Sequence, residues 1–160
     1  MAAPKSVTKI NKNGVFFESN VDWCEYTIKE LCRAALKDVG KFVRKKFREN
    51  FYTHFQRRTG QAPKAVKYTV FSSENTQFPR VDIGLPQSSP GNPVPGFYSF
   101  FQEVGTSKQR KLGILADTVE GNVSTIVKIE SQYLTALEDE AEALALIDEK
   151  EMTSEEDDDA

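Results

Sequence analysis

The chain has 160 residues, of which 39% are hydrophobic and 28% charged, and its formal net charge at pH 7 is −3. This length and composition are typical of one soluble domain with a modest core. The apolar runs are only a few residues long, whereas a bilayer span needs roughly 20, and no secretory signal is visible. We therefore expect a protein that is made and kept in a cytosol and has no membrane partner.

The first part of the chain predicts an arm followed by a long helix. Residues 1–18 are polar and basic apart from Val15, Phe16 and Phe17, which indicates a flexible arm with a small hydrophobic anchor. Apolar side chains then recur at three- and four-residue steps as far as Phe55, the pattern of an amphipathic helix. Gly40 interrupts this pattern at a cost of about 1 kcal/mol relative to Ala, and it marks either a break or a close helix crossing.

The middle of the chain predicts a hairpin, and its end a second helix. Thr59 and Gly60 stand where the first helix should end. Residues 66–71 and 80–85 alternate between apolar and polar side chains, which indicates two antiparallel strands joined by a polar turn. Residues 86–95 contain four prolines and read as an extended connector. A second amphipathic helix is expected from about residue 123 to 149.

The order helix, strands, helix predicts an α+β fold, in which a small antiparallel sheet packs against a long N-terminal helix and a C-terminal helix. We expect this single domain to cover residues 19–150. It lies between the flexible arm, residues 1–18, and an acidic tail, residues 151–160 (EMTSEEDDDA), whose composition is that of a disordered segment.

Few residues offer catalytic or metal-binding chemistry. Cys24 and Cys32 are eight positions apart, about 12 Å along a helix, which is too far for a disulfide, so we expect small buried thiols. Because His54 is the only histidine, no nucleophile–histidine pair or metal site is predicted. Glu25 and Glu103 are isolated carboxylates. The sequence predicts neither an enzyme nor a cofactor.

Charge is distributed unevenly along the chain. Residues 21–60 contain ten Lys or Arg against five Asp or Glu, whereas residues 138–160 contain twelve Asp or Glu against one Lys. Lys41, Arg44, Lys45 and Arg48 follow the spacing that places side chains on one helix face. This basic strip is either a solvated face or a surface that meets nucleic acid or an acidic protein.

An unusual segment, FYSFFQEVGTSKQ, covers residues 97–109. We expect Tyr98 and Phe101 to anchor it and Gly105 to supply a backbone conformation that a Cβ atom disfavours. Glu103 is expected to clamp the turn by accepting hydrogen bonds from Thr106 and Ser107. The clamp would present the loop from Ser107 to Lys111 to a neighbour. The alternative is an exposed Glu103 with no fixed partner.

The pattern Tyr98-Ser99-x-Phe101-x-Glu103-x-Gly105-Thr106 resembles a segment of the tail-completion, or head–tail joining, proteins of long-tailed bacteriophages. Thr59 and Gly60 occupy the place of the Thr-Gly pair that ends the first long helix in that family. The element order also matches, and the resemblance covers roughly residues 20–150. Two features depart from it: residues 111–116 replace the family's Pro-Phe-Leu-Arg-Pro-Ala segment, and the proline usual before the Thr-Gly pair is absent.

The resemblance implies a non-catalytic virion protein of the neck that assembles in the host bacterial cytoplasm. Such proteins form rings, typically hexameric, between the head-side connector or stopper and the tail terminator or tail tube. A ring needs one patch to dock on a different patch of the next copy, and the basic strip and the acidic last helix are the candidate patches. The residues expected at the oligomer or partner interface are Lys41, Arg44, Lys45, Arg48, Ser107, Lys108, Arg110 and Lys111. Those expected to form the structural turns are Thr59, Gly60, Glu103, Gly105 and Thr106.

Two roles for the basic strip remain open at this point. Within a ring lumen it would touch genomic DNA transiently. Alternatively, the chain is a small nucleic-acid-binding or regulatory module, in which the acidic tail competes with DNA for the basic helix. Rings in electron micrographs would favour the neck protein over this module.

Overall fold

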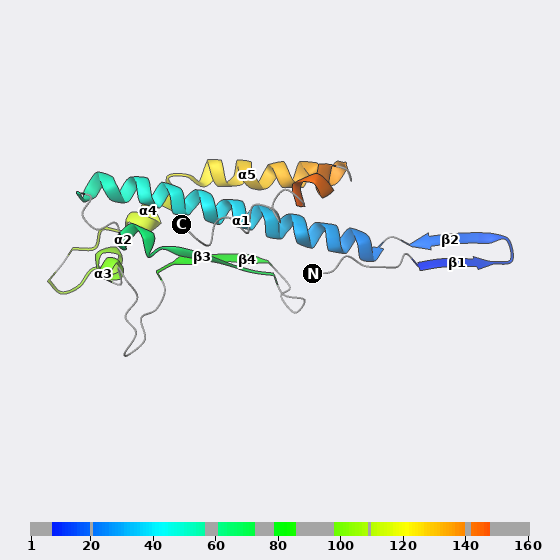
Figure 1. Ribbon diagram of the computed structural model, residues 1–160, viewed down its shortest axis with the longest axis horizontal. Coiled ribbons are helices and arrows are strands. Elements are labelled where there is room, and N and C mark those ends of the chain that lie inside the picture. Colours follow the sequence, from blue (N-terminus) through cyan, green and yellow to red (C-terminus); the bar gives the residue numbers. More distant parts are fainter. Residues whose placement is uncertain are drawn as a thin grey trace. The chain divides into compact units, whose positions relative to one another are not determined.

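The computed structural model describes residues 8–19, 21–56, 61–72, 79–85, 98–108, 110–139 and 142–147. Within these residues its elements are β1 (Thr8–Lys12), β2 (Val15–Ser19), α1 (Val21–His54), α2 (Gln61–Lys64), β3 (Lys67–Phe71), β4 (Arg80–Gly84), α3 (Tyr98–Val104), α4 (Ile114–Glu120), α5 (Val123–Thr135) and η1 (Ala136–Glu138) (Figure 1). The fold is α+β, as the sequence predicts. The predicted turn residues Thr59 and Gly60, the connector 86–95 and the tail 151–160 lie outside the described residues.

The chain divides into two compact units. Unit 1 comprises Met1–Ala35 and Ser131–Ala160, and unit 2 comprises Leu36–Glu130. The helix α1, whose bounds match the predicted long helix, contributes residues to both. In unit 1 its buried side chains include Leu31 and Ala34, and in unit 2 they include Val43 and Phe47.

Residues 8–19 of unit 1 form a hairpin, which differs from the flexible arm expected for residues 1–18. The strands β1 and β2 pair antiparallel, with Lys12 opposite Val15. Asn13 and Gly14 join them with φ angles of 55° and 78°, the left-handed conformation that two-residue hairpin turns require. Ile10, Val15 and Phe16 are exposed in this hairpin.

The predicted C-terminal helix is interrupted. The helix α5 ends at Thr135, a short 3-10 turn follows to Glu138, and Asp139 has an extended backbone with φ −127° and ψ 113°. Helical structure resumes over residues 142–147. Acidic side chains are unfavourable at the C-terminal end of a helix, and Glu138 and Asp139 stand at this end.

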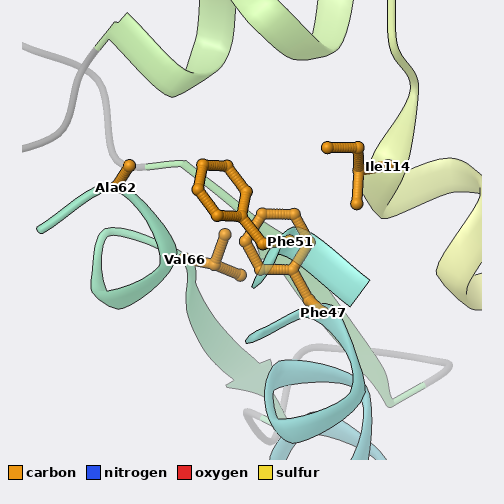
Figure 2. Close-up of a cluster of buried hydrophobic side chains, with 5 residues drawn as sticks. All are labelled: Phe47, Phe51, Ala62, Val66 and Ile114. Atoms are coloured by element: carbon orange, nitrogen blue, oxygen red, sulfur yellow. The ribbon is translucent and has the colours of Figure 1, made fainter. Parts of the chain in front are cut away.

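The core of unit 2 lies between α1 and the elements that follow it. Figure 2 shows the side chains of Phe47 and Phe51, from α1, gathered with Ala62, Val66 and Ile114. The rings of Phe47 and Phe51 lie 5.7 Å apart between centroids. The predicted hairpin is confirmed, because β3 and β4 pair antiparallel with Tyr68 opposite Ile83.

The structure gives Gly40 a role that the sequence left open. The helix α1 continues through Gly40 without a break. A Cβ atom added there would lie 2.5 Å from Cδ2 of Tyr68 on β3, so the glycine allows the aromatic ring to approach the helix backbone. The close crossing is between a helix and a strand of unit 2.

In the part of the chain that is described, no helix is both long enough and apolar enough to cross a membrane.

We predict that Gly40→Ala destabilises the protein by about 1–3 kcal/mol, although Ala is the better helix former, because Tyr68 must move away from the new methyl group. The measurement is the free energy of unfolding in urea. Gly84→Ala is the matched control, because a Cβ atom at Gly84 meets nothing within 4 Å. A Gly40→Ala protein as stable as the control would contradict this role.

Candidate functional site

The unusual segment forms a helix and a tight turn. The helix α3 ends at Val104, and the N–H of the next residue, Gly105, donates to the carbonyl of Phe101 at 2.8 Å. Gly105 has a φ of +84°, and a Cβ atom there would lie 2.8 Å from the backbone nitrogen of Lys111. Gly105 therefore needs to be glycine for two reasons, its left-handed backbone and the close return of the chain.

The chain then returns beside α3 and starts α4. The N–H of Leu112 donates to the carbonyl of Gln102 at 2.9 Å. Gly113 follows in a left-handed conformation, with φ 64°, and is the N-cap residue of α4. Because glycine has no side chain, it cannot accept a hydrogen bond from the first N–H groups of the helix, which therefore need another acceptor.

Glu103 supplies that acceptor from the preceding helix. Both of its carboxylate oxygens lie 3.0 Å from the N–H nitrogen of Leu115, and Oε1 lies 3.1 Å from that of Ala116. A carboxylate is also favourable at this end of a helix because the helix dipole is positive there. Glu103 thus caps α4 from a position 12 residues before Leu115.

The clamp predicted from the sequence has a different partner. Among the described residues, Glu103 accepts its hydrogen bonds from Leu115 and Ala116 and not from Thr106 or Ser107. Thr106 instead uses its hydroxyl oxygen to accept the N–H of Lys108 at 3.3 Å. The sequence has no signal for this cap, because the helix that it caps, residues 114–120, is too short to show a helical period.

Polar contacts tie the capped helix and α3 to the rest of unit 2. Thr118 of α4 is fully buried; its hydroxyl donates to the carbonyl of Ile114 at 2.6 Å and accepts from the side-chain amide of Asn50 on α1 at 2.9 Å. The hydroxyl of Ser99 in α3 donates to the carbonyl of Ala62 at 3.4 Å. Sequence reasoning missed Asn50 and Thr118, and it named Ser99 only as part of the phage-like pattern, without this contact.

The prediction that Phe101 anchors α3 is wrong, because 43% of this residue is exposed to solvent. Ser99, in contrast, is buried, with an exposed fraction of 3%. In a helix of seven residues only one narrow face can point inwards. Ser99, Gln102 and Glu103 share that face, and Phe100 and Phe101 are left exposed. The side chain of Tyr98 lies outside the described part of the structure.

A cavity of about 10 Å³ lies beside the cap, lined by residues that include Phe51, Ser99, Gln102, Glu103 and Ile114. This volume holds about one water molecule. The amide oxygen Oε1 of Gln102 is buried without a hydrogen-bond partner in the described structure, and a water molecule in this cavity is one way to satisfy such an atom. The cavity is therefore a packing feature and too small for an organic substrate.

The basic strip, defined as Lys41, Arg44, Lys45 and Arg48, lies on α1 within unit 2. Lys45 is exposed and the other three are half-buried. The Nε atoms of Arg44 and Arg48 are buried and have no hydrogen-bond partner among the described residues. Burial, and then repulsion from Arg44, lowers the pKa of Arg48 below its ordinary value.

The loop residues predicted at the interface surround the turn. Ser107, Lys108, Arg110 and Lys111 are all exposed. The backbone of Lys111 is held close to Gly105, whereas its side chain is free to reach solvent. The structure therefore places the predicted interface residues in two groups of unit 2, the basic strip and this basic loop.

The two cysteines are free. Cys24 is exposed, which corrects the expectation of two buried thiols, because α1 turns this position outwards. Cys32 is half-buried, and burial raises the pKa of its thiol. Within the described ranges, no cluster of three or more His, Cys, Asp or Glu side chains is placed to hold a metal ion.

Comparisons of the chain with protein-family models, with curated proteins and with solved structures find no match.

We predict that Glu103→Gln destabilises unit 2 by about 1–2 kcal/mol, because the amide is a weaker acceptor and places an N–H₂ group against two N–H donors. Amide hydrogen exchange should be faster at Leu115 and Ala116. Glu120→Gln on the exposed end of α4 is the matched control. Unchanged exchange at both amides would contradict the cap.

We also predict that Gly105→Ala lowers the free energy of unfolding, measured in urea, by at least about 1 kcal/mol more than Gly113→Ala does. Both glycines have positive φ, which costs an alanine about 1–2 kcal/mol, but at Gly113 the nearest atom to a new Cβ is 3.5 Å away. Only Gly105→Ala adds a clash with the backbone of Lys111. Equal losses for the two variants would show that the close return is unimportant.

Proposed function

We propose that this chain is a structural subunit of a bacteriophage neck. Copies of it form a ring, typically hexameric, that joins the head-side connector or stopper to the tail terminator or tail tube. The protein is assembled in the host cytoplasm, becomes part of the virion, and works by contact and not by catalysis.

The observation that carries this proposal is what the residues of the phage-like pattern do. Glu103 caps α4 and Gly105 permits the close return of Lys111, so both act on the shape of one turn. Each is used for backbone geometry, and the cavity that the described residues form beside Glu103 holds about one water molecule. A pattern that fixes a surface loop fits a protein whose function is docking.

The charges give the proposed ring its contact surfaces. The basic strip and the basic loop lie on unit 2, and the sequence of residues 138–160 is strongly acidic. One patch on each copy meeting a different patch on the next is the arrangement that closes a ring. Since single exposed ion pairs contribute only about 0–1 kcal/mol, charge sets orientation and encounter rate, and apolar contacts supply most of the affinity.

A nucleic-acid-binding module is the second candidate. The half-buried side chains of Arg44 and Arg48, whose Nε atoms have no hydrogen-bond partner among the described residues, favour it, because arginine binds phosphate well. The acidic residues 151–160 oppose it, since they repel phosphate. A salt-dependent gel shift of non-specific duplex DNA at sub-micromolar protein would favour this candidate.

We predict that reversing the charge of Lys41, Arg44 and Lys45 to Glu abolishes assembly, and that salt weakens assembly of the unaltered chain. The measurement is the mass of the assembled species by light scattering. Reversal of three exposed lysines elsewhere, Lys29, Lys64 and Lys67, is the matched control. Unchanged assembly of the first triple variant would contradict the proposed contact.

A further inference from the structure

The most unusual polar feature of the described structure is the pair of arginines on α1. Arg44 and Arg48 are four residues apart and therefore neighbours on one helix face. The Nε atom of each is buried and unpaired among the described residues. An unsatisfied buried donor is costly, and two adjacent guanidinium groups also repel each other. An anion at the solvent-accessible part of these half-buried side chains would offset the repulsion between them.

We propose that Arg44 and Arg48 form a carboxylate-binding site that takes acidic side chains from residues 151–160 of a second copy of this chain. The inference rests on the proposed function, because it names the partner segment of the ring contact. Bound carboxylates would accept hydrogen bonds from the guanidinium groups, in the geometry in which arginine binds a carboxylate with two parallel bonds.

Charge complementarity selects this occupant. Residues 151–160 contain six acidic side chains and no basic one, and five of the six form the unbroken run Glu155, Glu156, Asp157, Asp158 and Asp159. The strip that they would meet carries four cations. Burial and then repulsion from Arg44 lower the pKa of Arg48, and a bound carboxylate would raise it.

A second copy, and not the same copy, is the expected source of the segment. A ring is closed only by contacts between different copies. An acidic segment that reaches the next copy's arginines provides such a contact, and it leaves each copy with one free site and one free segment before assembly. It also makes the contact directional, because the site and the segment are different patches.

The first test uses the full chain with Glu155, Glu156, Asp157, Asp158 and Asp159 changed to their amides, so that the arginine site is vacant. A fluorescent peptide with the sequence of residues 151–160 is the probe, and its anisotropy reports binding. We expect binding that weakens with salt and that Arg44→Gln with Arg48→Gln weakens at least tenfold. Lys29→Gln with Lys67→Gln, at two exposed positions, should change it less than twofold.

A conservative variant separates geometry from charge. Arg44→Lys with Arg48→Lys keeps both charges but removes the planar guanidinium groups and their two-bond geometry, so we expect intermediate binding. Circular dichroism and thermal unfolding check that every variant is folded. Peptide binding that is absent, or that is equal with and without the two arginines, overturns the proposal. Arginine-dependent binding of duplex DNA that excludes the peptide also overturns it, in favour of a phosphate partner.

The second test asks which copy supplies the segment. The Arg44→Gln and Arg48→Gln chain keeps its acidic segment, and the amide-substituted chain keeps its arginines. In sedimentation velocity, we expect each variant chain alone to remain unassembled. A mixture of the two should form one-to-one pairs, because only the arginines of one variant and the acidic segment of the other can meet. The absence of pairing in the mixture would overturn the second-copy assignment. The assignment is also overturned if the unaltered chain, as a dilute monomer, does not bind the peptide, because its own acidic segment would then occupy the arginines.

These outcomes are distinct from failure of the proposed function. Rings that persist when the acidic segment is neutralised contradict this inference and leave the ring in place. Conversely, arginine-dependent peptide binding and pairing by a chain that never closes into rings support the carboxylate site and contradict the neck function.

Discussion

The interaction on which the rest of the site depends is the carboxylate of Glu103 against the first N–H groups of α4. Its oxygens lie 3.0 Å from the nitrogen of Leu115, and the N-cap position itself is a glycine without an acceptor. A seven-residue helix has little stability of its own, so α4 depends on this cap and on its burial against α1. Without the cap, the turn at Gly105 and the basic loop that follows it would lose one of their two fixed ends.

The capped helix α4 also connects the basic loop to the helix α1, which carries the basic strip. Thr118 of the capped helix is bonded to Asn50 of α1, and α1 also carries Arg44 and Arg48 six and two positions earlier. Both proposed contact groups are therefore mounted on one packed unit, whose core is the cluster around Phe47 and Phe51 (Figure 2). Rigid mounting reduces the entropy lost when a surface docks, which suits a subunit that must meet its neighbours in one orientation. The neck function proposed above requires this property of each copy.

The sequence predicts the long helix and the β3–β4 hairpin because their patterns are local and repeat every few residues. It also contains Asn-Gly at residues 13 and 14, a dipeptide typical of two-residue hairpin turns, but the expectation of a flexible arm did not take this signal into account. The cap at Glu103 was not predictable in the same way, since its partners lie 12 and 13 residues away and belong to a helix too short to have a period. The exposure of Phe101 and the approach of Tyr68 to Gly40 likewise depend on tertiary packing that periodicity does not encode.

The central claim is that a structural cap shapes a surface used for ring assembly, and electron microscopy of the purified protein tests it most directly. The unaltered chain and the Glu103→Gln chain are compared in negative stain after both are shown to be folded. The account predicts closed rings of uniform size for the unaltered chain, and folded subunits that fail to close into rings for the variant. Equal rings from both chains, or no ring from the unaltered chain under any assembly condition, would contradict it.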